Sequence, residues 1–326
     1  MGQKRLLSID LIKVVAMCAV MCLHTQYAYS GASPLAHFLY ISAVVAIPLF
    51  FMTSGWLLLG RSDTDCKYAV RKICGILRFV TIITVLWYAV SGYRHHTGLL
   101  NTTVGSLFQR GPMSVFWYFG AMIIIYALLP YLNILYREHF RSFISVVFTS
   151  FIIASVIFVL NISNGIHIEQ HTIQTFRLWN WLFYFCIGGA LKKYAIHVNW
   201  LLVAFMFATN YLFQMQMLPY MDTQFCEYFY SSLPVMALSI VLFAALRDIG
   251  GKWLVSVIGG GKIFLPCYTI HLFLIGSTQN YFEKIFPDCL GIDAEALCFW
   301  LFICIISISL SWLIMRIPFM DRIFRI

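Results

Sequence analysis

The sequence is poor in charged residues, and this shortage excludes most soluble folds. Asp, Glu, Lys and Arg make up 11% of the 326 residues, whereas 61% are hydrophobic. About a quarter of the residues in a typical soluble domain are charged, because its surface must interact with water. The sequence therefore predicts an all-α, polytopic integral membrane protein.

Two further kinds of feature are missing. We find no internal repeat, and none of the polar connections between apolar runs is long enough to form a separate domain, so we expect a single domain over residues 1–326. The ten cysteines contain no C-x-x-C pair. We therefore expect no metal site and interpret the cysteines as small apolar residues within helices.

What the sequence does contain is a series of long apolar runs. A helix that crosses a bilayer needs about 20 residues, and a chain of this length has room for about ten such helices. The predicted spans are 7–28, 38–60, 75–92, 115–135, 143–163, 178–196, 198–218, 229–247, 254–280 and 296–316.

The distribution of Lys and Arg predicts how these spans are oriented. With a cytoplasmic N-terminus, sixteen Lys and Arg residues lie on the inner side and four on the outer side, with Lys13 and Lys262 inside spans. The positive-inside rule then places both termini in the cytoplasm. This orientation explains the net charge of +9, so we expect no nucleic-acid partner. The four outer residues are Arg94, Arg110, Arg177 and Lys284.

The first apolar run has two interpretations. A basic N-terminus, an apolar run and the small residues of "SGASPLA" are also the pattern of a cleaved signal peptide. However, the run is longer than the apolar part of a typical signal peptide. It also contains Asp10, Lys13 and His24, which a disposable segment would not need. These features favour a spanning helix.

The three ionisable residues lie on one side of this helix. At 100° and 1.5 Å per residue, Lys13 and His24 are about 20° apart around the helix and about 16 Å apart along it, and Asp10 lies about 40° from His24. A charge at the bilayer centre costs at least about 2.5 kcal/mol, so we expect this stripe to face the bundle interior or a water-filled cavity. The alternative is that Asp10 and Lys13 merely pair near the cytoplasmic interface.

Four sequence elements resemble the membrane-bound acyltransferase family 3. They are Lys13 with ten intervening residues before His24, "AIPLFFMTSGWLLLG" at 46–60, "FWYFGAMIIIYALLPYL" at 116–132 and "CYTIHLFLI" at 267–275. Three features depart from the family pattern. Lys13 replaces the usual Arg, no His precedes Trp117, and the cytoplasmic Arg-rich element is recognisable only as "RKICGILR".

The resemblance implies an O-acyltransferase in the inner membrane of a bacterial cell. Such an enzyme moves an acyl group, most often acetyl, from cytoplasmic acyl-CoA to a hydroxyl of a surface polysaccharide or its lipid-linked precursor. Acetyl-CoA is then a donor substrate, and no cofactor is bound permanently. The expected partners are acyl-CoA, the glycan or lipid-linked saccharide, and membrane lipids.

Candidate site residues follow from the chemistry of this reaction. An attacking hydroxyl needs a base, and His24 is the candidate because the pKa of histidine lies near working pH. Basic side chains suit the phosphates of CoA, although each also fits the positive-inside pattern. We assign Asp10, Lys13, Arg71, Lys72, Arg78, Trp117 and His271 to donor or substrate binding. For His271 a structural role is an alternative, and for Trp117 a core or interfacial role.

A transporter of a small solute or a lipid-linked glycan is the alternative function. Transporters also place ionisable groups within spans, but they usually show repeat symmetry and matching broken helices in two halves. We find no such pair in this sequence.

Overall fold

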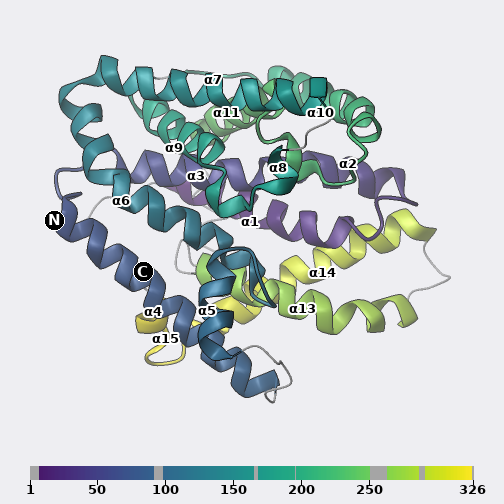
Figure 1. Cartoon of the computed structure of the whole chain (residues 1–326). Coiled ribbons are helices and arrows are strands. Elements are labelled where there is room, and N and C mark those ends of the chain that lie inside the picture. Colours follow the sequence, from purple (N-terminus) through teal and green to yellow (C-terminus); the bar gives the residue numbers. More distant parts are fainter. Residues whose placement is uncertain are drawn as a thin grey trace. The chain divides into compact units, whose positions relative to one another are not determined.

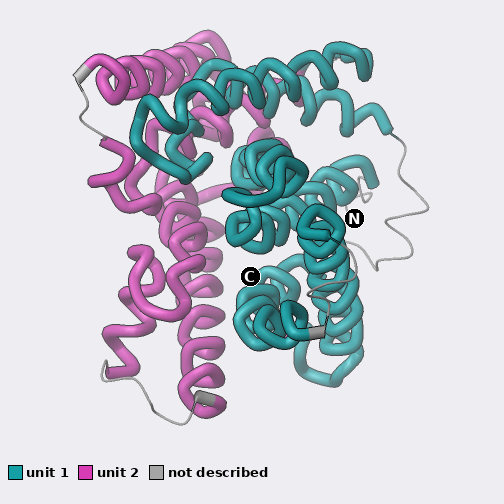
Figure 2. The backbone as a smooth tube through the Cα atoms, turned by 90° about the vertical axis from the view of Figure 1, so that its right-hand side faces the viewer, with its two compact units in different colours: residues 1–53, 194–321 teal, residues 54–193, 322–326 magenta. Residues whose placement is uncertain are grey.

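The structure of the protein is a computed structural model that describes residues 7–91, 98–164, 168–194, 196–249, 263–285 and 291–324. Helices make up 84% of the structure and the described residues contain no strand, which confirms the all-α prediction (Figure 1). The chain divides into two compact units, residues 1–53 with 194–321 and residues 54–193 with 322–326 (Figure 2). A single domain over 1–326 stays a prediction, because this division does not show whether either unit folds alone.

The first unit is built around α1 (Leu7–Gln26). Twelve of its twenty residues are buried, and it packs against four other helices of the unit, so it has little surface left for lipid. Two of these neighbours, α13 and α14, run side by side (Figure 1). The other helices wholly in this unit are α2 (Pro34–Ser42), α10 (Trp200–Tyr220), α11 (Leu233–Asp248), α13 (Phe264–Ile285) and α14 (Gly291–Ile314).

The second unit contains the middle of the chain. In it α4 packs on α6, α6 on α7, and α7 on α9. The outward stripe of α7 is apolar: Phe148, Val156 and Val159 are each at least half exposed. Such a stripe is suited to lipid contact. The helices are α4 (Cys66–Ser91), α5 (Leu99–Leu107), α6 (Trp117–Glu138), α7 (Phe140–Asn164), α8 (Ile168–His171) and α9 (Leu178–Lys193), and a short α15 (Met320–Ile323) lies near the C-terminus.

Two glycines explain how α3 (Ala46–Leu58) meets α9 within the second unit. A Cβ atom at Gly55 would overlap the carbonyl oxygen of Phe185, and one at Gly189 would overlap the side chain of Leu59. The backbones therefore approach more closely than any larger residue allows. Gly60 ends this segment with φ of +82°, a conformation that glycine adopts readily.

The turn that follows α3 is held by one amide side chain. Asn133 of α6 accepts a hydrogen bond from the Gly60 backbone N–H (2.7 Å) and donates to the Arg61 carbonyl oxygen (2.5 Å). It also bonds Thr64 Oγ1. A buried amide with these three partners fixes the path of the chain from α3 into α4.

Seven candidate spans lie in the described part of the chain. They agree with seven of the ten predicted runs, although several begin earlier; α2, for example, starts at Pro34 because the Ser33 hydroxyl accepts a hydrogen bond from the Ala36 N–H. The seven are Leu7–Gln26, Pro34–Leu58, Cys66–Val90, Ser114–Glu138, Phe140–Ser163, Trp200–Tyr220 and Gly291–Ile314.

The count of ten spans is not confirmed. The runs 178–196 and 229–247 form α9 and α11, and each has 16 residues, which gives a length of about 24 Å against about 30 Å for the hydrocarbon core. The run 254–280 overlaps α13, and its first part lies outside the described residues. One predicted connection also contains structure, since α5 forms between the spans at 75–92 and 115–135.

Candidate active site

The N-terminal end of the α1 stripe forms an ion pair. Lys13 Nζ lies 3.7 Å from Asp10 Oδ1, one helical turn away, and the same ammonium lies 6.0 Å from the ring centroid of Phe264. Asp10 is buried and Lys13 is half-buried. The Asp10–Lys13 pair, which the sequence analysis gave as an alternative, is therefore present. The stripe also faces a neighbouring helix, because Phe264 is the first residue of α13.

The C-terminal end of α1 contacts a second histidine. The rings of His24 and His271 lie 5.3 Å apart between centroids, at an interplanar angle of 41°. His271 is fully buried, whereas His24 is exposed. The sequence singled out both residues, and the structure brings them together.

The hydrogen bonds of His271 determine which ring nitrogen carries a proton. Its Nδ1 lies 2.7 Å from the Tyr268 carbonyl oxygen, and because that oxygen can only accept, Nδ1 is the donor. A neutral ring then has a lone pair on Nε2. This atom is buried and has no hydrogen-bond partner among the described residues. A buried acceptor of this kind is available to a neighbouring N–H or to a substrate.

Hydrogen bonds to α14 fix the position of the C-terminal half of α1. The Gln26 side chain donates to the Ala296 carbonyl oxygen (2.8 Å), and Trp300 Nε1 donates to the Cys18 carbonyl oxygen (3.0 Å). Just beyond the helix, the Tyr29 hydroxyl donates to Glu295 (3.2 Å). These contacts lie on both sides of His24 along the chain, so they hold the backbone that carries it.

An aromatic pair that the sequence did not single out lies in the same unit. The rings of Tyr27 and Phe225 are stacked, with centroids 5.4 Å apart and an interplanar angle of 11°, and the side chains are 39% and 40% exposed. Tyr27 follows His24 by three residues, so its closeness to a candidate catalytic residue could have marked it in the sequence. The sequence contains no comparable indication for Phe225, because its nearness to Tyr27 follows from the fold.

The basic residues predicted to bind the donor lie in the second unit, on α4. Arg71 and Arg78 are seven residues apart, so they share one face of the helix, about 10 Å apart along it, and both are exposed. Lys72 lies about 100° around the helix, with its ammonium 5.4 Å from the ring centroid of Tyr68. Two of the three cations therefore present one basic face.

Neighbouring cations have local structural partners. Arg61 donates two hydrogen bonds to Asp63 (2.8 and 2.5 Å), which lower the pKa of that carboxyl below its usual range. Lys192 Nζ donates to the Leu59 carbonyl oxygen (3.0 Å), and Lys193 Nζ to that of Tyr136 (3.3 Å). These carbonyls lie near helix C-termini, where lysines commonly satisfy them. Arg71 and Arg78 are the exposed arginines that share one face of α4.

Trp117 lies in a packed aromatic cluster of the second unit. It begins α6, is 7% exposed, and packs against Trp181 with ring centroids 5.2 Å apart and an interplanar angle of 31°. Trp181 Nε1 in turn donates to the Gln174 carbonyl oxygen (2.6 Å). These contacts are those of a core residue, the alternative stated for it, and its role in substrate binding stays a prediction.

Within the part of the chain that the structure describes, no group of three His, Cys, Asp or Glu side chains is placed to hold a metal ion. The nine cysteines there are all free.

Comparisons with known proteins bear on this arrangement. A family model described as an acyltransferase domain matches residues 6–316. Among curated proteins, an amino-acid racemase from Enterococcus faecalis is 28% identical over 163 residues, which are 47% of this chain and 21% of the racemase. The match thus spans about a fifth of that relative's length. No solved structure matches the chain.

Proposed function

Because this chain belongs to acyltransferase family 3, we propose a specific reaction for this multi-pass membrane acyltransferase. It transfers an acyl group, with acetyl as the expected one, from cytoplasmic acyl-CoA to a hydroxyl of a surface polysaccharide or its lipid-linked precursor. The observation that supports this reaction most directly is the His24–His271 pair at the outer end of α1. The setting we propose is a bacterial inner membrane with both termini in the cytoplasm.

His24 is the general base of the proposed reaction. It takes the proton of the acceptor hydroxyl as that oxygen attacks the thioester carbonyl and the new C–O bond forms. The tetrahedral intermediate then collapses, the C–S bond breaks, and CoA leaves as a thiolate that takes the proton back from the imidazolium. Exposure of the His24 ring is consistent with this role, because a base must reach its substrate.

His271 is a positioning residue for His24 in this proposal. Its Nδ1–H is used by the Tyr268 carbonyl oxygen, so Nε2 is the nitrogen that can accept a hydrogen bond from His24. Such a bond would leave the second nitrogen of His24 as the basic one and would stabilise the imidazolium that forms. Two imidazoles would thus replace the carboxylate and imidazole of a more familiar catalytic pair.

The donor and the acceptor approach from opposite ends of α1. Two separate contacts are assigned to the donor: the basic face of α4 suits the CoA phosphates, and the α1 stripe from Lys13 to His24, about 16 Å along the helix, suits the pantetheine arm. The acceptor sugar rests on the exposed rings of Tyr27 and Phe225, which are suited to stacking against the apolar face of a sugar.

The base is tested by His24→Ala. General-base help is worth roughly two to four orders of magnitude, so transfer should fall at least about 100-fold while the protein inserts, melts at the normal temperature and binds acyl-CoA. The measurement is incorporation of labelled acetyl from acetyl-CoA into the glycan fraction of membranes that contain each variant. His139→Ala is the matched control, because its ring is exposed and belongs to no part of the proposed site. Normal labelling with His24→Ala would overturn the assignment.

The donor site is tested by replacing its cations together. Arg71→Gln combined with Arg78→Gln should weaken acyl-CoA binding by at least about tenfold, because charge-assisted contacts to phosphate are lost. Arg141→Gln removes another exposed arginine outside this face and should leave the affinity unchanged. If the unchanged protein, the double variant and Arg141→Gln bind acyl-CoA with equal affinity, Arg71 and Arg78 serve only to orient the chain in the membrane.

A further inference from the structure

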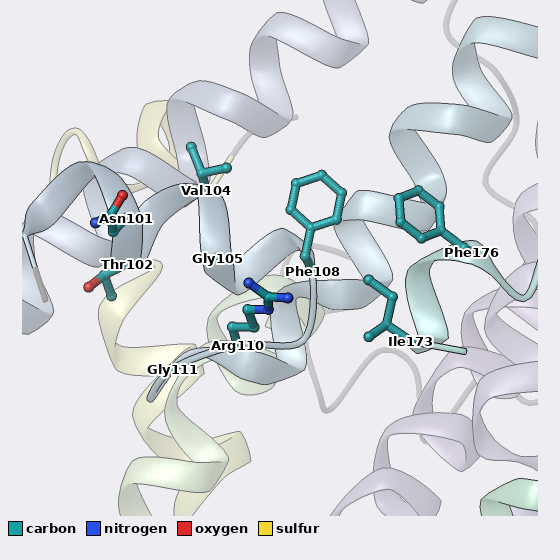
Figure 3. A pocket seen from close by; sticks show the side chains of 9 residues that line it. All are labelled: Asn101, Thr102, Val104, Gly105, Phe108, Arg110, Gly111, Ile173 and Phe176. Atoms are coloured by element: carbon teal, nitrogen blue, oxygen red, sulfur yellow. The ribbon is translucent and has the colours of Figure 1, made fainter. Parts of the chain in front are cut away.

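The second unit contains a pocket that the reaction above does not use. It has a volume of about 640 Å³, within the range of small-molecule sites, and Figure 3 shows the side chains that line it. Its walls come from α5 with the turn that follows, and from the segment just before α9. The lining residues are Asn101, Thr102, Val104, Gly105, Phe108, Arg110, Gly111, Ile173 and Phe176.

Hydrogen bonds between the two walls hold the pocket in shape. The Gln109 side chain, from a residue with φ of +58°, accepts from the Gln174 backbone N–H (2.9 Å). The Thr175 hydroxyl donates to the Leu107 carbonyl oxygen (2.6 Å). Arg177, which is buried, donates to the Thr172 carbonyl oxygen (2.9 Å), and this bond stabilises the conformation of the segment that forms the second wall. The backbone that carries the lining side chains is therefore held in place by these hydrogen bonds.

The chemistry of the lining combines one cation with two aromatic rings. Phe108 and Phe176 lie with their ring centroids 5.6 Å apart, and Phe176 is 47% exposed (Figure 3). Arg110 is exposed, and none of the ion pairs among the described residues involves it. Asn101, also exposed, adds an amide with donors and an acceptor.

The charge of the pocket is positive. Glu169 is the only acidic residue in the segments 98–111 and 168–177, and it is buried and hydrogen-bonded by Asn161. It does not line the pocket, so Arg110 is the one charged side chain among the lining residues. A ligand with hydroxyls, an apolar face and a negative group would meet a complementary partner at each wall: an arginine for the anion, an amide for hydroxyls and two rings for the apolar face.

We propose that this pocket binds a saccharide unit that carries a carboxylate or a phosphate. In the predicted topology both walls belong to extracytoplasmic connections, the side from which a surface glycan would arrive. This role rests on the proposed function: the pocket is a second saccharide subsite in addition to the Tyr27–Phe225 pair, so the acceptor is an acidic oligosaccharide or polymer. The binding itself depends on no step of the transfer reaction.

The test is calorimetry on the full chain in uncharged detergent, with no acyl donor present. The probes are an oligogalacturonate hexasaccharide, neutral maltohexaose, and phosphatidylglycerol added to the micelles. We expect the acidic hexasaccharide to bind at least about tenfold more tightly than the neutral one, and phosphatidylglycerol not to displace it. Arg110→Gln should abolish this preference, and Phe176→Ala should weaken binding of both sugars at least threefold.

Matched variants and one catalytic variant complete the design. Arg141→Gln and Phe205→Ala remove an exposed arginine and an exposed phenylalanine elsewhere and should bind as the unchanged protein does. His24→Ala should also bind normally, which separates this site from the transfer reaction. The proposal is overturned if the acidic sugar does not bind, if Arg110→Gln leaves its affinity unchanged, or if phosphatidylglycerol displaces it, which would make the pocket a lipid headgroup site.

Discussion

At the scale of single residues, His271 has two ring nitrogens in different situations. Nδ1 is committed to a carbonyl oxygen of its own helix, while Nε2 is buried with no partner among the described residues, 5.3 Å between ring centroids from His24. Burying an acceptor without a partner costs roughly 1–3 kcal/mol. A cost of this size is accepted more readily where the atom serves a function.

His271 should therefore be sensitive to the loss of its acceptor. His271→Phe keeps a flat ring but removes Nε2, and we expect kcat to fall about 10- to 100-fold while the KM for acyl-CoA stays within twofold. His271→Gln retains an acceptor and should recover part of kcat. If His271 had only a packing role, His271→Phe would keep a higher kcat than His271→Gln, because the phenylalanine ring fills the site better than a glutamine.

The sequence predicted these residues only in part. The Lys13–His24 stripe follows from helical periodicity, and the Asp10–Lys13 pair follows from their spacing of three. The meeting of His24 and His271 could not be derived from spacing, because it depends on how α1 packs against α13. Tyr27 and Phe225 were missed for the same reason, since stacking of two distant rings leaves no local pattern.

At the scale of elements, the close contact of α3 with α9 depends on glycine. Gly55→Ala should lower the melting temperature in detergent by several degrees, because its Cβ would overlap the Phe185 carbonyl oxygen and overpacking typically costs about 1–3 kcal/mol. Gly276→Ala is the control: this glycine is also helical, is exposed, and has nothing within 4 Å of the added Cβ. The melting temperature of the Gly276→Ala variant should stay unchanged or rise. Equal changes in melting temperature for Gly55→Ala and Gly276→Ala would show that helix propensity alone determines the effect.

Element type was well predicted from hydrophobic runs, whereas element ends were not. The run predicted at 75–92 begins instead at Cys66, since Asp65 accepts a hydrogen bond from the Tyr68 N–H and caps the new helix. Hydropathy could not find this start, because the first turns of α4 carry Lys and Arg. It also could not find α5, which is short and rich in Thr, Asn and Gly.

At the scale of the whole molecule, the distribution of Lys and Arg predicts on which side of the membrane each connection lies. Reporters fused after Asp63 and after His197 should lie in the cytoplasm, and those fused after Gly111 and after Asp222 should lie outside. Asp63 lies in the connection between α3 and α4, so a fusion there interrupts neither helix. A reporter after His197 on the outer side would show that α9 does not cross, and would reverse every later connection.

The sequence also left the division of the chain unseen. The first unit joins the N-terminal residues to the segment after 194, and this pairing leaves no composition shift or linker to mark it. The predicted site residues are divided accordingly, with Asp10, Lys13, His24 and His271 in one unit and the basic face of α4 and Trp117 in the other. Sequence reasoning treats such residues as one set because it sees only their order.

The length of α9 and of α11 has a consequence for the surrounding lipid. If each crosses the membrane, its rise of about 24 Å falls roughly 6 Å short of an average hydrocarbon layer. Hydrophobic mismatch of this size is relieved when the bilayer thins locally, at a fraction of a kcal/mol per Å. In the proposed reaction, a thinner bilayer would shorten the route from the cytoplasmic thioester to the outer hydroxyl. Lipid tail length would then regulate the transfer physically, and we expect faster transfer by the same chain in short-tailed membranes than in thick ones.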